Sequence, residues 1–210
     1  MNHKQDLTYN SVMRAYRGVN LNTLWFLIGL NVLIFVIEFA VGGYPITVDN
    51  PVVRLLGLST AQLAQQPWTM ISSIFVHGGF GHILFNMISL YFLGSFFFRA
   101  VGERSFLAVF FLGGLAGNAL FAVLVPPYVT GIGASGAIFA IGGALAVIVP
   151  RVPVYIFFIP IAMPLWVAIL IFFLLSFLFA GIAWQAHLGG VLAGVIAGFI
   201  LRRRKRIYYF

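Results

Sequence analysis

The chain alternates between long apolar runs and short connections that are polar or rich in glycine and proline. A transmembrane helix needs about 20 mostly apolar residues to cross the ~30 Å hydrocarbon core of a bilayer. The apolar runs predict spanning helices over residues 24–41, 82–98, 104–125, 135–149, 164–180 and 185–201. The pattern therefore predicts an all-α polytopic membrane protein, a bundle of six helices.

One connection, residues 42–81, is long, and in residues 52–74 it mixes polar side chains with Leu, Trp and Phe. Such a mixture favours a segment that lies partly in the membrane interface. The expected organisation is an N-terminal segment 1–20, a membrane domain 21–201 and a basic tail 202–210. Between the fourth and fifth helices, the helix breakers Pro150, Pro153 and Pro160 predict a connecting segment.

Composition supports a membrane protein and the charge orients it. Hydrophobic residues make up 62% and charged residues 8% of the chain, far below the ~25% charged residues of soluble domains. With six spans, eleven of the twelve lysines and arginines fall on one side, and only Arg54 falls on the other. The positive-inside bias makes that side the cytoplasm. The net charge of +8 is therefore interpreted as a signal that orients the helices, and the basic tail is expected to contact anionic lipid. No nucleic acid partner is expected.

Polar side chains inside a bilayer are costly and are functional hypotheses by default. Four of them, His82, Asn86, Ser135 and His187, are expected near the outer ends of their helices. Counted at ~1.5 Å per residue from the nearest inner arginine, Ser135, His187 and His82 lie at about 22–26 Å, with Asn86 about one turn deeper. The common depth predicts that they converge.

Small residues would let two of these helices approach each other closely. The last helix carries Gly190, Gly194 and Gly198 in register with His187, and the fourth carries Gly142 and Gly143. If these faces pack together, Ser135 and His187 become neighbours at the outer end.

This arrangement suits acyl transfer. A histidine can take the proton of a serine hydroxyl near neutral pH and so make it a nucleophile. Asparagine and histidine side chains, together with the amides at a helix N-terminus, can stabilise an oxyanion. Because Glu38 and Glu103 have no evident route to His187, the sequence predicts a Ser–His dyad and not a triad. No cofactor and no metal are expected.

Three blocks then resemble the rhomboid intramembrane serine proteases. They are His77-Gly-Gly-Phe-Gly-His82-Ile-Leu-Phe-Asn86, Gly133-Ala134-Ser135-Gly136 and Ala186-His187-Leu188-Gly189-Gly190 with Gly194 following. The resemblance implies Ser135 as nucleophile, His187 as general base and acid, and His82, Asn86 and the Ser135 amide as oxyanion hole. It implies cleavage of single-span membrane proteins near the outer surface, with lateral entry past the fifth and second helices. The expected location is a prokaryotic cell membrane with both termini in the cytoplasm.

Competing interpretations remain open. The chief one is a catalytically inactive rhomboid-like protein that binds transmembrane clients, and a second is a small transporter or channel. A metal site of His77, His82 and His187 is a weaker alternative, because no carboxylate or thiolate joins the histidines. His77, Glu38 and Asn118 are expected to be structural. The sequence leaves the substrate and the oligomeric state open.

Overall fold

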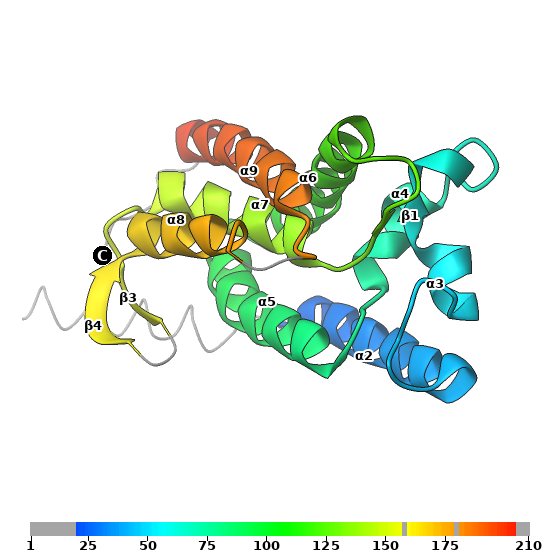
Figure 1. The fold of residues 1–210 in the computed structure, drawn as a ribbon. Coiled ribbons are helices and arrows are strands. Elements are labelled where there is room, and N and C mark those ends of the chain that lie inside the picture. Colours follow the sequence, from blue (N-terminus) through cyan, green and yellow to red (C-terminus); the bar gives the residue numbers. More distant parts are fainter. Residues whose placement is uncertain (1–19, 157–158, 179–180, 205–210) are drawn as a thin grey trace, which may run out of the picture.

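The computed structural model describes residues 20–156, 159–178 and 181–204. Nearly all of the predicted N-terminal segment 1–20 and most of the basic tail 202–210 lie outside the described residues. The described chain forms one helical bundle with two short two-stranded sheets (Figure 1).

Four helices are long and apolar enough to cross a membrane. They are α2 (Asn22–Gly42), α5 (Phe80–Val101), α6 (Glu103–Leu124) and α9 (Trp184–Arg204). Each coincides with a predicted span, with ends that differ by one to three residues. Apolar side chains cover both their inner and their outer faces: in α2, Leu24 is fully buried whereas Phe26 is 67% exposed. A helix that is apolar on its exposed face suits lipid as its surroundings.

The fourth and fifth predicted spans are shorter helices in the structure. α7 (Ser135–Ile148) has 14 residues and α8 (Leu165–Leu175) has 11, which correspond to about 21 and 16 Å of helix. The predicted helix 164–180 is therefore too long, because the chain turns at residues 176–178. The number of six spans stays a prediction.

The segment between α7 and α8 is a β-hairpin that the sequence pattern did not predict. Strands β3 (Pro153–Ile156) and β4 (Ile159–Pro164) pair antiparallel, with Pro153 opposite Pro164. Proline is compatible with this pairing because each strand of a two-stranded sheet has an edge that needs no N–H donor. The prolines break helix formation as expected, but the chain remains extended and paired.

The predicted long connection folds into a compact unit. It contains α3 (Pro51–Leu56), β1 (Leu58–Ser59), the 3₁₀ turn η1 (Thr60–Gln62), α4 (Thr69–Ser72) and a second 3₁₀ turn η2 (Ser73–Phe75). β1 pairs antiparallel with β2 (Thr130–Gly131), the segment that leads into α7. Asn118 of α6 donates hydrogen bonds to the Met70 carbonyl at 2.8 Å and to Ser73 Oγ at 2.9 Å. Asn118 thus has the structural role expected of it, and it holds the unit against the bundle.

Helix α7 lies at the centre of the bundle, between α9 on one side and α5 on the other (Figure 1). Ten of its 14 residues are buried. Three glycines of α9, Gly190, Gly194 and Gly198, face the α7 backbone at Gly136, Ala140 and Ala144 respectively. A Cβ on Gly198 would stand 2.8 Å from the Ala144 carbonyl oxygen. The four-residue spacing on both helices therefore produces the close packing predicted for α9.

Gly142 and Gly143, the two glycines noted in α7, face different helices. A Cβ on Gly143 would lie 2.7 Å from the Val191 carbonyl oxygen of α9, whereas a Cβ on Gly142 would meet the Ile169 side chain of α8 at 2.8 Å. Adjacent helical residues are about 100° apart around the axis, so they face different neighbours. α7 thus contacts α9 and α8 with consecutive glycines.

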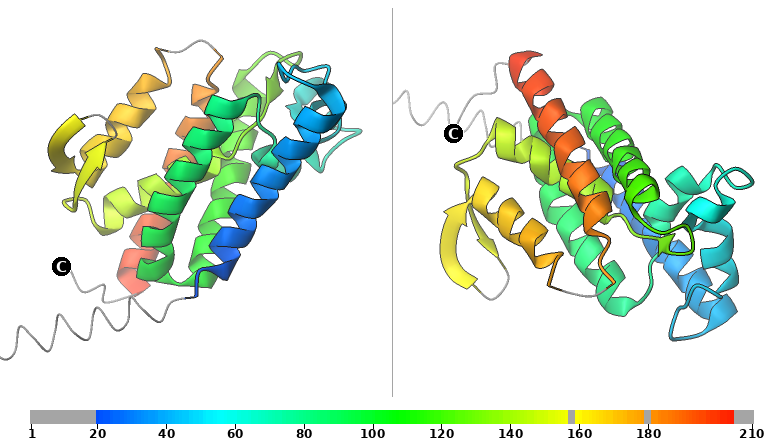
Figure 2. Two further views of the ribbon diagram at one scale, coloured as in Figure 1. Left: turned by 90° about the horizontal axis from the view of Figure 1, so that it is seen from below. Right: turned by 45° about the horizontal axis from the view of Figure 1, so that its top comes forward.

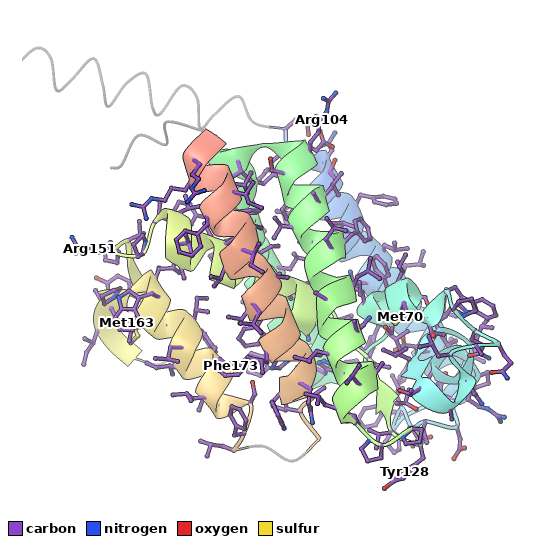
Figure 3. All side chains as sticks on the ribbon, turned by 90° about the horizontal axis from the view of Figure 1, so that it is seen from above. Met70, Arg104, Tyr128, Arg151, Met163 and Phe173 are labelled. Carbon is purple, nitrogen blue, oxygen red and sulfur yellow. The ribbon has the colours of Figure 1, made fainter. Side chains whose placement is uncertain are left out.

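Among the described residues, Arg99, Arg104 and Arg203 lie at one end of the bundle, where α5 and α9 end and α6 begins. The left view of Figure 2 shows the start of α2, the α5–α6 link and the end of α9 at that end. Figure 3 shows Arg104 at the same end as the last turn of α9, and Tyr128 at the opposite end. α7 and α9 both begin toward the Tyr128 end, away from these basic residues.

Candidate active site

Ser135 is the first residue of α7, and the local backbone explains why the helix begins there. Gly133 has φ +114°, a conformation that favours glycine, and its N–H donates to the Ser73 carbonyl at 2.9 Å. The first helical hydrogen bond runs from Ile138 N–H to the Ala134 carbonyl. The amides of residues 135–137 therefore have no carbonyl partner within α7. Ser135 thus lies at a helix N-terminus, beside N–H groups that make no hydrogen bond within α7.

His187 lies in the first turn of α9 and meets Ser135 directly. Its Nε2 is 2.7 Å from Ser135 Oγ, although the two residues are 52 positions apart in the sequence. The histidine is 6% exposed. The close approach of α9 to α7 through Gly190 brings the two side chains together. The structure thus forms the Ser135–His187 contact that the sequence suggested.

The other ring nitrogen of His187 has a partner that the sequence analysis did not identify. Nδ1 lies 2.7 Å from Ser176 Oγ, in the turn that follows α8. The Phe139 ring lies against the imidazole, with centroids 4.3 Å apart and planes at 31°. Two signals were available in the sequence: Ser176 is a lone hydroxyl within an apolar run, and Phe139 follows Ser135 by four residues on one helix face.

His82 and Asn86 lie one turn apart at the start of α5, as their spacing predicts. A Cβ on Gly133 would stand 2.6 Å from His82 Nε2, so the histidine ring lies against the loop that enters α7. Asn86 Nδ2 donates to the His82 carbonyl at 2.8 Å, and its buried Oδ1 has no hydrogen-bond partner in the described part of the chain. Among the hydrogen bonds of the described residues, none joins either side chain to Ser135. The structure therefore brings His82 next to the serine loop and leaves a second Asn86 amide hydrogen for another acceptor.

Glu38 anchors the segment that precedes α5. This residue of α2 is fully buried, and its carboxylate accepts the His77 N–H at 3.2 and 3.3 Å. Asn50 Nδ2 donates to the Glu38 backbone carbonyl at 2.8 Å. The His77 ring packs edge-on against His82, with centroids 5.0 Å apart. Glu38 and His77 thus support the site from behind, in keeping with the structural roles expected of them.

His77 is kept neutral by its surroundings. Burial and, to a smaller extent, the neighbouring His82 lower the pKa of His77 to about 3. Its Nδ1 lies 3.3 Å from the Phe75 carbonyl, which can only accept, so Nδ1 carries the proton. Within the described ranges, no group of three or more His, Cys, Asp or Glu residues could hold a metal ion.

Replacing Glu38 by alanine is expected to lower the free energy of unfolding by about 1–3 kcal/mol, because the His77 N–H would lose its acceptor in a buried place. Glu38→Gln keeps an acceptor oxygen and should cost less than the alanine variant. The measurement is equilibrium unfolding in mixed micelles. Glu103→Gln, at an exposed carboxylate that accepts from Thr23, is the control and should change stability by less than about 0.5 kcal/mol. An alanine variant as stable as the wild type would show that the anchor contributes nothing.

Comparison with known proteins gives consistent matches. The model of the Rhomboid domain matches residues 64–204. RHOMBOID-like protein 5 of Arabidopsis thaliana is 33% identical over 164 residues, which cover 76% of this chain and 52% of that protein. The putative rhomboid protease YdcA of Bacillus subtilis is 31% identical over 151 residues, covering 68% of this chain and 71% of that protein.

A relative named inactive also matches. Inactive RHOMBOID-like protein 8 of Arabidopsis thaliana is 32% identical over 91 residues, which are 42% of this chain and 26% of that protein. The chain thus spans about half the length of RHOMBOID-like protein 5 and about a quarter of that of the inactive relative. The names of the relatives thus include both a protease and an inactive protein.

Proposed function

Since the chain belongs to the rhomboid family of multi-pass membrane proteins, we propose that it is an intramembrane serine endopeptidase. The reaction is hydrolysis of a peptide bond in or beside a transmembrane segment of another membrane protein. The observation that carries the proposal is the 2.7 Å contact between Ser135 Oγ and His187 Nε2 at the N-terminus of α7. A nucleophile, a base within hydrogen-bond reach and the first amides of a helix are then in one place.

Ser135 and His187 carry out the acylation step. Ser135 Oγ attacks the scissile carbonyl carbon while His187 Nε2 takes the hydroxyl proton. The carbonyl oxygen of the substrate becomes an oxyanion, which the Ser135 amide, the His82 ring and the Asn86 amide stabilise by donating hydrogen bonds. As the C–N bond breaks, His187 returns the proton to the leaving amine and an acyl-enzyme remains on Ser135.

Deacylation repeats the sequence with water. His187 takes a proton from a water molecule, which attacks the acyl carbonyl, and the same donors hold the second oxyanion. Collapse releases the new carboxyl terminus and returns the proton to Ser135. Every proton transfer in both steps passes through His187 Nε2, and the residues need no cofactor for this chemistry.

Substrates are proposed to be single-span membrane proteins with small residues such as alanine beside the scissile bond. Ser135 lies among Gly133, Ala134 and Gly136, and Phe139 covers His187, so the space around the hydroxyl is confined. We place the site toward the outer side of a prokaryotic cell membrane and the termini in the cytoplasm. The positions of the basic residues at the far end of the bundle support this orientation (Figure 3).

An inactive rhomboid-like protein that binds transmembrane clients is the alternative. A relative carries that description in its name. The paired Ser135 and His187 side chains favour the enzyme, because a client-binding protein has no need for a hydrogen-bonded serine and histidine. Activity alone decides between the two.

The test is a cleavage assay in liposomes with a single-span substrate and wild type beside Ser135→Ala. Mass spectrometry of the fragments locates the cut. We expect a cut in or near the membrane segment by the wild type and none by the variant. Equal cleavage by both would remove Ser135 as nucleophile. Absence of cleavage over several substrates, with client proteins still retained in a pull-down, would favour the binding protein.

A further inference from the structure

The contact of Ser176 with His187 gives the dyad a third member. Ser176 Oγ is 2.7 Å from His187 Nδ1, on the side of the ring opposite to Ser135, and also 3.4 Å from the Phe172 carbonyl. The side chain is 4% exposed, so both contacts lie away from the surface. The two serine hydroxyls therefore hold the two nitrogens of one imidazole.

The Phe172 carbonyl favours one tautomer of His187. A serine hydroxyl has one proton to donate and lone pairs to accept with, whereas a carbonyl can only accept. If Ser176 donates its proton to Phe172, its oxygen is left to accept from His187, and Nδ1 must carry the histidine proton. Nε2 then presents its lone pair to Ser135 Oγ, as a general base requires.

The opposite tautomer would disable the site. With the proton on Nε2, His187 would donate toward Ser135 and could not take its proton. A histidine held in the wrong tautomer loses activity even when the geometry is intact. An acceptor on Nδ1 also favours the imidazolium that forms during attack, because hydrogen bonds to charged groups are stronger than those between neutral groups.

The position of Ser176 ties this effect to α8. Ser176 follows directly after α8, which packs inward mainly through Leu165, Ala168 and Ile169. Other side chains of α8 are exposed, including Leu170 and Leu174. α8 lies at the edge of the bundle in both views of Figure 2. Because Ser176 follows α8 and His187 packs against α7, the position of α8 relative to α7 sets the distance between Ser176 and His187.

We propose that Ser176 is a positioning residue that fixes the proton of His187 on Nδ1 and so prepares Nε2 to activate Ser135. This inference rests on the proposed protease function. Ser176 touches His187 and acts through it, without contact to the substrate.

The test measures kcat and KM for cleavage of a single-span substrate by wild type, Ser176→Ala and Ser176→Thr. Loss of the hydroxyl should lower kcat by about 10- to 100-fold, with KM changed by less than about twofold because the hydroxyl does not contact the substrate. Threonine keeps the oxygen and should restore most of the rate. Ser95→Ala is the matched control, because Ser95 is also buried and bonds a carbonyl of its own helix, Phe92, at 3.3 Å.

A small fluorophosphonate probe gives a second readout that needs no docking of a transmembrane segment. Ser135 Oγ forms a bond to phosphorus, fluoride leaves, and His187 takes the hydroxyl proton, so the labelling rate reports the base itself. Ser176→Ala should slow labelling by about the same factor as kcat. A variant that merely disturbs substrate entry would label at the wild-type rate, and this outcome would overturn the inference.

Further outcomes keep the two proposals apart. If the wild type cleaves and labels through Ser135 but Ser176→Ala matches Ser95→Ala, the positioning role is wrong and the protease function stands. If Ser176→Ala melts well below wild type in detergent, the pair Ser176→Thr and Ser176→Val decides, since the two have the same shape and differ in the hydroxyl. Equal rates for that pair would overturn the role. If the wild type neither cleaves nor labels, the protease function fails, and the inference fails with it.

Discussion

Replacing His187 by alanine is expected to lower kcat for peptide-bond cleavage by about 10⁴-fold or more, to the background of the assay. His187 Nε2 lies 2.7 Å from Ser135 Oγ, and no other ionisable side chain of the described residues is hydrogen-bonded to this hydroxyl. Without the imidazole, the serine proton has no acceptor during attack and the leaving amine has no donor. Initial rates in liposomes with a single-span substrate measure the effect.

A double variant tests whether Ser135 and His187 act as one unit. Residues that act as one unit have strongly non-additive effects, so Ser135→Ala with His187→Ala should be no slower than either single variant. Ser95→Ala, a buried serine outside the site, should keep the wild-type rate within about twofold. Measurable cleavage by either single variant, with a further loss in the double variant, would show that the two residues act independently and would contradict the dyad.

Replacing Gly194 by alanine is expected to destabilise the folded protein by at least about 3 kcal/mol. The new Cβ would overlap the backbone of Ala140, whose carbonyl carbon and Cα would both lie 2.7 Å away. A backbone at the centre of the bundle cannot move aside as the end of a side chain can, so α9 must separate from α7. Thermal unfolding in detergent, followed by circular dichroism, measures the loss.

Gly29 offers a matched control for the same substitution. It lies in the middle of α2, and a Cβ there would have nothing within 4 Å. Gly29→Ala should leave the melting temperature unchanged or slightly raise it, since alanine is the better helix former. Cleavage should also separate the two variants: the Gly194 change moves His187 away from Ser135 and lowers the rate, and the Gly29 change does not. Equal melting temperatures would mean that the α7–α9 contact is looser than the structure has it.

The long helices were predictable because their signal is local. Runs of about 20 apolar residues identified α2, α5, α6 and α9 without any tertiary information. The glycine spacing of α9 also carried information, since a four-residue repeat of small residues marks a face for close packing. The early end of α8 and the pairing of β3 with β4 escaped prediction, because an apolar run with prolines does not by itself distinguish a helix from paired strands.

The sequence by itself determined the candidate chemistry, which is a serine, two histidines and an asparagine near the starts of three apolar helices. The tertiary structure decided which of them meet and what supports them. It joined Ser135 to His187, placed Ser176 on the second ring nitrogen, and set Glu38 behind His77. These contacts link residues 11 to 52 positions apart. The apolar runs fix where the long helices lie in the sequence. A hydrogen bond between two elements depends instead on how closely and at what height they pack, and the glycines between α7 and α9 set that distance only in the folded bundle.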